Sequence, residues 1–505
     1  MRSAFFLLLL TVGANLGPWL RPDWTGTEGQ RVLVAHGMLA SGEWFVPSMG
    51  GEPLLTKPPL YYWVLAAVES VCGISPVAAR APSVLGIWFA ALVAFGVLSR
   101  SVDRRAAWWG AIGTVLAPAL VWHGAFAEID PLFACLVAVS ALWLVDGTVR
   151  SSRRTLALAG VVGALAVLTK GPPFAMFIAG PLVVAMRRQA RLIAAWFLPF
   201  LIVPLAGFGV IFLRALDASG AAGAAASTAA SESVGRILAF DSASLADIPL
   251  HLLRSLAYAM PFAWFWLPRL RVPVADAGSS AARLVEVACW SAYLGAVVAL
   301  VFFPARPARY LLPGIPLLAP AVAASMATFT RTGCDGRESS VQFAMRGLAI
   351  AMLLAMPWLP AFASVPSILA WLALGCASWF LRGREGTLVA VLATPVVLIG
   401  TVVTDGIRSR SAGLRDESAI ARMLRDSLAR LGAREFEFLG NPGETLALLM
   451  DPSARWRDRV SREVRTDFVI ERVRDGADSE LDPMRWIERE RVRGRDRVFV
   501  VAQRR

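Results

Sequence analysis

The sequence predicts an all-α polytopic membrane protein with about 13 transmembrane helices and a small soluble α/β domain at its C-terminal end. Of the 505 residues, 56% are apolar and only 17% are charged, which excludes an ordinary soluble domain and a disordered chain. The charges are also segregated, because residues 405–505 hold 22 Arg and 19 acidic residues. We therefore predict a membrane body over residues 1–404 and a water-soluble domain over residues 405–505.

The body divides into apolar segments of the length that a bilayer requires. A transmembrane helix needs about 20 predominantly apolar residues. The thirteen predicted spans are 4–20, 80–99, 106–122, 131–149, 155–169, 173–186, 192–213, 251–268, 284–303, 310–329, 342–362, 365–381 and 386–404. The first span resembles a signal peptide, but Trp19, Arg21 and Pro22 stand where a cleavage site would be, so we expect it to be retained.

Short Arg-bearing loops follow every second span, starting with the second. They lie at 100–105, 150–154, 187–191, 268–272, 331–337 and 382–385. The positive-inside rule places these loops and the N-terminus in the cytoplasm. An odd number of spans then places the C-terminal domain outside the cytoplasm, which is permitted because long domains translocate largely regardless of charge.

The predicted outer segments hold nearly all the unusual polar residues. The first of them, residues 21–79, contains two amphipathic stretches at 29–41 and 60–73 that indicate helices lying along the membrane surface. The predicted outer loop at 214–250 has a composition typical of a flexible linker.

Lysine is the rarest cation in the chain: there are 48 Arg and two Lys, Lys57 in LLTKPPLYYW and Lys170 in LTKGPPF. Both lie in predicted outer turns. A lysine ammonium and an arginine guanidinium are not interchangeable in a tight pocket, so we interpret both lysines as binding residues. The alternative is a lysine that extends from the membrane edge into water.

Carboxylates occur in the same outer segments, at Glu28 in TGTEGQR and at Glu128 and Asp130 in HGAFAEIDPLF. Ionisable groups at membrane depth usually mark a cavity or a pathway. Asp130 has a second explanation, as the N-cap of a helix whose first residue is Pro131.

Arg306, Arg309 and Tyr310 precede a predicted span on the same side, in PARPARYLLPGIP. Anchoring at the membrane interface explains the two arginines equally well. Taken together, carboxylates beside Lys and Arg indicate an anionic, phosphate-bearing substrate with an acid or base next to it. The net charge of +13 does not indicate nucleic acid, since the Arg residues form short loop clusters. The five scattered cysteines predict no metal site.

Four motifs in this order resemble a known family: TEGQRVLVAHGMLASGEWFVPSMGGEPLLTKPPLYYW, IDPL, LTKGP and the Arg-rich segment before RYLLP. They are similar to the lipid-linked sugar transferases of the GT-C class, which include bacterial lipid A aminoarabinose transferase and the protein O-mannosyltransferases. The resemblance covers about residues 1–330.

This resemblance implies an inverting glycosyltransferase that uses a polyprenyl-phosphate-linked sugar and needs no cofactor. The sugar would pass to a lipid, glycan or protein acceptor on the outer face of the inner membrane. Lys57, Lys170 and Arg306 would face the phosphate, and a carboxylate would take the acceptor proton. Glu128, Arg309 and Tyr310 would contribute to substrate binding.

One position departs from the family pattern. The family's catalytic Asp falls on Thr27, and only the neighbouring Glu is kept, as Glu28. We therefore expect Glu28 to be the base, with Asp130 second, unless this chain is a catalytically inactive lipid-binding relative. A transporter or flippase for lipid-linked sugars is the other alternative, although no internal repeat relates two halves of the spans.

The C-terminal segment alternates helical and strand patterns. Residues 415–431 and GETLALLM are typical of helices, whereas FEFLG, DFVIERV and RVFVVAQ are typical of strands. On the outer face this domain would cap the cavity or select acceptors, or it would act only as a folding cap.

Overall fold

The computed structural model describes residues 2–19, 24, 27–49, 52–54, 57–124, 126–219, 247–259, 262, 280–303, 306–329, 420–433, 436–439, 450, 456–457, 468–473, 486–493 and 498–504. The chain divides into two compact units. The bundle unit comprises Met1–Trp19, Thr56–Leu60 and Arg80–Asp405. The sheet unit comprises Leu20–Leu55, Tyr61–Ala79 and Gly406–Arg505.

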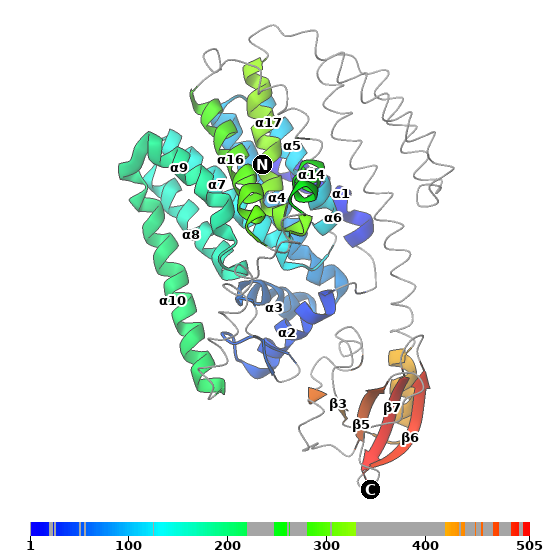
Figure 1. Cartoon of the computed structure of the whole chain (residues 1–505). Helices are drawn as coiled ribbons and strands as arrows, with labels where there is room; N and C mark the ends of the chain where they lie inside the picture. The colour runs from blue at the N-terminus through cyan, green and yellow to red at the C-terminus, as the bar shows by residue number, and fades with distance from the viewer. Residues whose placement is uncertain are drawn as a thin grey trace, which may run out of the picture. The chain divides into compact units, whose positions relative to one another are not determined.

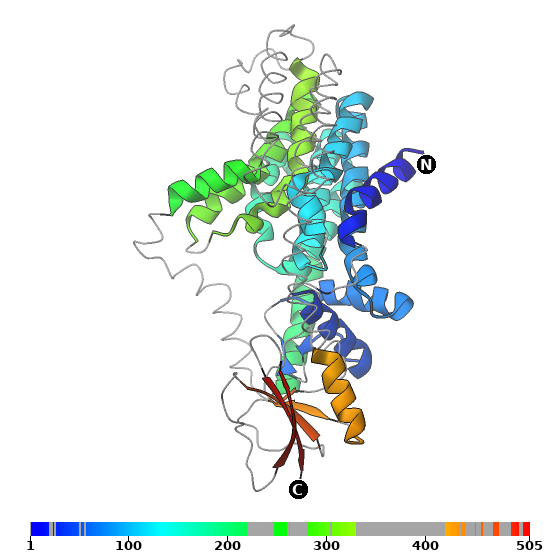
Figure 2. The ribbon, with the colours of Figure 1, turned by 90° about the vertical axis from the view of Figure 1, so that its right-hand side faces the viewer.

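The bundle unit is built from helices (Figure 1). They are α1 (Arg2–Trp19), α4 (Pro76–Ser101), α5 (Arg104–Val115), α6 (Pro118–Gly124), α7 (Ile129–Val149), α8 (Arg153–Lys170), α9 (Phe174–Gln189), η1 (Ala190–Leu192), α10 (Ala194–Ser219), α14 (Ile248–Tyr258), α16 (Ser280–Val301), η5 (Ala308–Gly314) and α17 (Ile315–Phe329). Helix α7 is the centre of the packing, because it contacts α8, α9, α16, α17 and η5. Figure 2 shows α14 lying across the direction of the bundle helices.

The sequence sets the ends of the helices that lead to the candidate site. Asp103 caps α5, since its side chain accepts a hydrogen bond from the Ala106 backbone N at 2.7 Å. Ser152 caps α8 in the same way, through the Thr155 backbone N at 3.3 Å. Helix α8 ends at Lys170 because Gly171 adopts φ +84°, which glycine reaches without steric cost.

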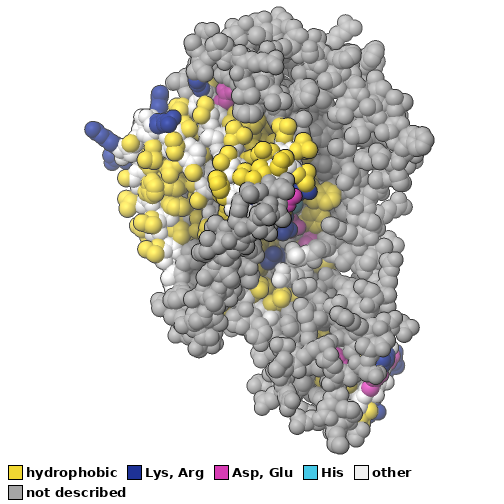
Figure 3. Space-filling view, viewed as in Figure 1, with side chains coloured by type: hydrophobic (Ala, Val, Ile, Leu, Met, Phe, Trp, Pro, Cys, Tyr) yellow, Lys and Arg dark blue, Asp and Glu magenta, His cyan; other side chains and the backbone are white. Residues whose placement is uncertain are grey.

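Several helices have the length and composition of membrane spans. Among the described residues, Pro76–Ser101, Ile129–Val149 and Ala281–Val301 qualify, and the bent pair Phe174–Leu192 and Ala194–Gly207 gives a fourth candidate. Figure 3 shows apolar side chains gathered over α8, α9 and α10, with basic side chains at one edge. The prediction of a mostly helical chain with candidate membrane spans is confirmed. The predicted spans 342–362, 365–381 and 386–404 lie outside the described residues.

Three predicted spans differ from the described helices, and in one of them, 251–268, the helix α14 ends at Tyr258. The segment 106–122 is broken between α5 and α6. Pro118 disfavours the helical conformation of Ala117, the residue before it, and donates no backbone hydrogen bond. The segment 310–329 begins as the 3₁₀-helix η5 and continues as α17. Helix α10 extends to Ser219, beyond the predicted end at residue 213. Most of the predicted loop 214–250 lies outside the described residues.

The first part of the sheet unit contains two helices at the positions predicted to be amphipathic. They are α2 (Glu28–Ser41) and α3 (Leu60–Cys72), with a short hairpin of β1 (Ser48–Met49) and β2 (Glu52–Pro53) between them. His36 hydrogen-bonds Glu69 at 2.7 Å, and Arg31 donates to the Tyr62 hydroxyl at 2.9 Å. These two contacts join α2 to α3.

The C-terminal part of the sheet unit is a five-stranded sheet of order β4-β3-β5-β7-β6. The strands are β3 (Glu437–Leu439), β4 (Trp456–Arg457), β5 (Phe468–Val473), β6 (Trp486–Arg493) and β7 (Val498–Arg504). β4 and β5 run parallel to β3, and β5, β7 and β6 pair antiparallel. A helix over residues 420–430 meets β6, where Ser427 donates to Glu490 at 2.6 Å. Strands therefore occur at FEFLG, DFVIERV and RVFVVAQ, whereas most of GETLALLM lies outside the described residues.

Candidate functional site

An ion pair between Asp130 and Lys170 forms the centre of the candidate site in the bundle unit. Asp130 lies in the first turn of α7, and Lys170 is the last residue of α8. Both side chains are largely buried, with 15% and 13% of their surface exposed. The N-cap of α7 is Glu128 and not Asp130, so the capping explanation of Asp130 is wrong.

Aromatic rings surround the Lys170 ammonium. Its Nζ lies 5.6 Å from the centroid of the Phe133 ring on α7 and 5.2 Å from that of Tyr310 on η5. The Arg309 guanidinium lies 5.8 Å from the same Tyr310 ring. Such distances allow cation–π attraction, which holds a cation in place while leaving its N–H groups free to donate.

A third element, α14, brings Tyr258 to the same place. Tyr293 on α16 donates to the Ser255 backbone O at 2.6 Å, and His251 Nε2 lies 3.1 Å from the Val297 backbone O. These bonds fix α14 against α16. The Tyr258 hydroxyl is buried and finds no hydrogen-bond partner among the described residues, and it is near enough to Asp130 to feel the charge of that carboxylate. An unpartnered buried hydroxyl is costly, so Tyr258 has an unused hydrogen-bonding group at this site.

A histidine–glutamate pair completes the cluster. His123, near the end of α6, places Nδ1 3.0 Å from Glu128 Oε2. The His123 side chain is 12% exposed and the Glu128 side chain is 30% exposed. Glu128 is thus more accessible than Asp130, two residues further along the chain.

The remaining predicted residues have different environments. Arg306 donates from Nε to the Leu300 backbone O at 3.1 Å and from Nη2 to the Val301 backbone O at 2.8 Å, so it caps the C-terminal end of α16. Lys57 is half-buried in the turn before α3. Glu28 belongs to the sheet unit, where it is the first residue of α2 and is fully buried, whereas Thr27 before it is exposed. The structure thus brings together Asp130, Lys170, Tyr310, Arg309 and Glu128.

Tyr258 and His123 were not predicted from the sequence. A signal was available, because the whole chain holds only five Tyr and three His. Tyr258 and Tyr310 lie at this site, with Tyr293 supporting it from α16. The rarity that drew attention to the lysines applies equally to these residue types.

A second polar cluster lies at the opposite end of α7. Asp146 is buried and accepts hydrogen bonds from Arg100 Nε at 3.2 Å and Nη2 at 2.9 Å, and from Arg150 at 3.5 Å. It therefore joins two of the predicted cytoplasmic loops. Sixteen residues separate Asp130 from Asp146, which is about 24 Å along a helix. A groove of about 590 Å³ between α8 and α10 is lined by Arg153, Arg154 and apolar side chains, away from the candidate site at Lys170.

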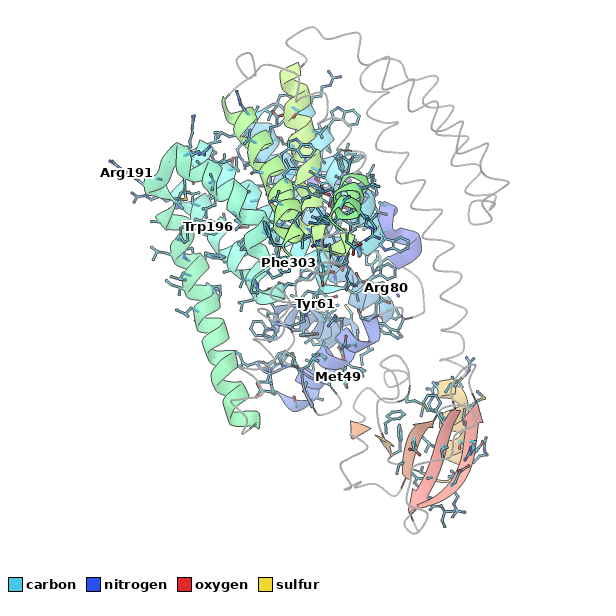
Figure 4. The ribbon with its side chains drawn as sticks, viewed as in Figure 1. Met49, Tyr61, Arg80, Arg191, Trp196 and Phe303 are labelled. Carbon is cyan, nitrogen blue, oxygen red and sulfur yellow. The ribbon has the colours of Figure 1, made fainter. Side chains whose placement is uncertain are left out.

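Figure 4 labels one exposed and one buried side chain of the bundle unit, Arg191 and Trp196. Arg191 extends outward from the turn between α9 and α10, where it is exposed. Trp196 points into the packed interior and stacks on Phe200 with ring centroids 4.5 Å apart. Basic side chains therefore concentrate at a helix turn, while the aromatic packing lies between the helices.

The fold of the chain is similar to that of solved multi-helix membrane transferases, and part of its sequence matches a transferase family. Residues 19–216 match the family model of dolichyl-phosphate-mannose-protein mannosyltransferase. The crystal structure of ArnT from Cupriavidus metallidurans in the apo state is similar with a TM-score of 0.71 and 17% identity, over 99% of this chain and 98% of that one. The structure of the same protein bound to undecaprenyl phosphate is equally similar, with a TM-score of 0.71. The resemblance suggested by the motifs is confirmed.

The chain is also similar in sequence to named transferases. Undecaprenyl phosphate-alpha-4-amino-4-deoxy-L-arabinose arabinosyl transferase 2 of Pseudomonas fluorescens is 32% identical over 174 residues, which cover 33% of this chain and 28% of that enzyme. The corresponding transferase of Pseudomonas aeruginosa is 30% identical over 180 residues, which cover 33% of this chain and 31% of that enzyme. These alignments span less than a third of the length of either relative.

Proposed function

We propose that the protein is an integral-membrane inverting glycosyltransferase. It transfers a sugar from a polyprenyl-phosphate donor to a lipid, glycan or protein acceptor on the outer face of the inner membrane. The observation that carries this proposal is the Asp130–Lys170 ion pair at one end of α7, flanked by Phe133 and Tyr310. The enzymes with similar sequences are named for undecaprenyl-phosphate-linked aminoarabinose, which makes that lipid the first donor to test.

In this mechanism the cations bind the donor phosphate. Lys170 supplies a buried ammonium, and the Tyr310 ring holds it in position. As the bond between the sugar and the phosphate breaks, negative charge grows on the departing phosphate oxygen, and a fixed cation stabilises it. Lys57 and Arg309 are the further phosphate-binding candidates. Arg306 ranks below them, since two of its nitrogens already bind α16 carbonyls.

The acceptor hydroxyl must lose a proton as it attacks the sugar. Glu28 and Asp130 remain our predicted bases from the sequence. Two observations weigh against them: Glu28 is fully buried, and proton uptake by Asp130 would break its ion pair with Lys170.

The proposed topology has thirteen spans, a cytoplasmic N-terminus and a periplasmic C-terminal domain. The body covers residues 1–404 with the outer loop 21–79, and the α/β domain covers residues 405–505. The Arg100–Asp146–Arg150 cluster supports a common side for the loops at 100–105 and 150–154, with the Asp130–Lys170 site at the other end of α7.

Release of undecaprenyl phosphate tests the function. Purified protein in lipid receives undecaprenyl-phosphate-linked aminoarabinose and a membrane extract as the source of acceptor. We expect the wild type to release undecaprenyl phosphate and Lys57→Ala to abolish this release. Lys170→Met should weaken donor binding about 10- to 100-fold, the effect of losing a charged hydrogen bond of roughly 1.5–3 kcal/mol. Arg191→Met is the matched control, because it removes an exposed cation from the turn between α9 and α10.

The same assay separates the rival functions. A flippase would move the intact donor between leaflets of a vesicle without releasing undecaprenyl phosphate. An inactive relative, the alternative that Thr27 suggests, would bind the donor and release nothing with any acceptor extract. Either result from the wild type contradicts the proposed transferase.

A further inference from the structure

The side chain that accepts the proton at this site must be able to do so without losing a stabilising contact. Asp130 is paired with Lys170, and Glu28 is fully buried in the sheet unit. The His123–Glu128 pair has neither restriction. It lies beside the ion pair in the chain, because Glu128 directly precedes α7 and Asp130 is in the first turn of that helix.

The chemistry of the His123–Glu128 pair determines which atom donates the hydrogen bond. An ionised carboxylate only accepts hydrogen bonds, so Nδ1 of His123 carries the proton in its 3.0 Å contact with Glu128 Oε2. In a neutral imidazole with Nδ1 protonated, Nε2 has a free lone pair. The described residues provide no hydrogen bond to Nε2, and the side chain is 12% exposed.

A carboxylate that holds the Nδ1–H of an imidazole orients the ring and stabilises the imidazolium that forms when Nε2 takes a proton. An imidazole is also the side chain that changes charge near neutral pH in its ordinary state. These two properties are what a general base requires.

We infer that His123 is the general base of the transfer reaction and that Glu128 is its positioning residue. This inference rests on the proposed function. The acceptor hydroxyl gives its proton to Nε2, and its oxygen forms the bond to the anomeric carbon. The bond from that carbon to the phosphate oxygen breaks, and its electron pair leaves with polyprenyl phosphate. The imidazolium then returns its proton to solvent.

His123→Asn separates this role from a structural one. The amide NH₂ of asparagine replaces Nδ1 and still donates to Glu128, but nothing replaces Nε2. We expect kcat for undecaprenyl-phosphate release to fall at least 100-fold, in the range usual for loss of a general base, while KM for the donor stays within threefold. If the pair only joins α6 to α7, this variant keeps wild-type kcat.

Glu128→Gln and the double variant complete the test. Glutamine retains an oxygen that accepts from Nδ1 but lacks the charge that stabilises the imidazolium, so kcat should fall about 10-fold or more. Residues that act as a unit are not additive, so the double variant should be no slower than His123→Asn. Should His123→Asn fail to bind the donor, His123→Gln carries the same kcat test.

Three results decide the matter. Loss of kcat in His123→Asn with retained donor binding supports the inference. Activity within threefold of wild type in both His123→Asn and Glu128→Gln overturns it, and Asp130→Asn and Glu28→Gln then identify the base. A wild type that binds the donor but releases no undecaprenyl phosphate with any acceptor contradicts the proposed function itself, which is a different outcome.

Discussion

At the scale of single residues, Tyr258 offers a prediction in which stability and activity change in opposite directions. Its hydroxyl is buried near Asp130, and no described residue is its hydrogen-bond partner. Tyr258→Phe removes a polar group whose burial costs free energy. The free energy of unfolding should therefore stay the same or rise by at most about 1 kcal/mol, and the unfolding temperature should follow it. If a donor oxygen is the missing partner, KM for the lipid-linked sugar should rise about 5- to 10-fold.

Tyr293→Phe is the matched control, because this hydroxyl has a partner. It donates to the Ser255 backbone O at 2.6 Å, so its loss should lower stability by roughly 1 kcal/mol. Thermal unfolding and donor titration of both variants measure the contrast. A Tyr258→Phe protein that is clearly less stable than wild type would mean that the hydroxyl has a structural partner.

The residue scale also shows what the sequence allowed us to predict at the site. The two lysines were distinctive because Arg replaces Lys elsewhere, and Lys170 does lie against Asp130. The position of Tyr258 could not be predicted, since α14 reaches the site only through tertiary packing. His123 contacts Glu128 only five residues away, and the rarity of histidine was a signal that we did not use. The charge of Arg306 was visible in the sequence, but its contacts with the α16 carbonyls were not.

At the scale of elements, close packing of α8 against α10 depends on a glycine. A Cβ at Gly160 would lie 2.2 Å from the Trp196 backbone O, and small residues allow membrane helices to approach this closely. Gly160→Ala should therefore destabilise the protein by about 1–3 kcal/mol through overpacking. The thermal unfolding temperature in detergent measures the loss.

Gly209 on α10 is the control, because a Cβ there meets nothing within 4 Å. Gly209→Ala should be neutral or stabilise by up to about 1 kcal/mol, the helix preference of alanine over glycine. Equal effects of the two alanines would show that the α8–α10 contact is looser in solution.

The contact between α2 and α3 should make stability depend on pH. Burial raises the pKa of Glu69, and the hydrogen bond from His36 only partly opposes this. An acid with a raised pKa binds its proton more tightly in the folded protein. Its contribution to stability is complete below the ordinary value of 4.5 and is lost as the pH rises through the folded pKa.

We therefore expect the wild type to lose stability relative to Glu69→Gln as the pH rises above 4.5, since glutamine is always neutral. Hydrogen exchange of the α3 amides in both proteins follows the change locally. A difference between the two proteins that is constant over this range would show that Glu69 has the same pKa in the folded and unfolded states.

Sequence patterns located most of these elements, and the exceptions have physical causes. Apolar length predicted α4, α7 and α16, which bury long uninterrupted faces. Apolar length alone predicted one span where the structure has α5 and α6, because a count of apolar residues does not detect the break before Pro118. The strands β5 and β7 were predictable from their alternation, whereas the parallel pairing of β3 with β4 and β5 joins segments whose order the pattern does not specify.

At the scale of the whole molecule, the polarity of α7 predicts the orientation of the protein in the membrane. One end of this helix carries Asp130 with Lys170, and the other carries Asp146 with Arg100 and Arg150. Because Arg-rich loops stay in the cytoplasm, the Asp146 end should face the cytoplasm and the Lys170 end the periplasm.

Single cysteines test this orientation in a protein whose five native cysteines are replaced by alanine. Pro172 is exposed beside Lys170, Arg153 and Arg104 are exposed near the Asp146 cluster, and Ser41 is exposed at the end of α2. In spheroplasts, a membrane-impermeant maleimide should label Pro172→Cys and Ser41→Cys, while Arg153→Cys and Arg104→Cys react only after permeabilisation. Labelling of positions 172 and 153 from the same side would contradict a transmembrane α8, and with it a transmembrane α7, because the Asp130–Lys170 pair joins the two helices. Labelling of positions 172 and 41 from opposite sides would separate the two lysine turns and remove the basis for one outer phosphate site.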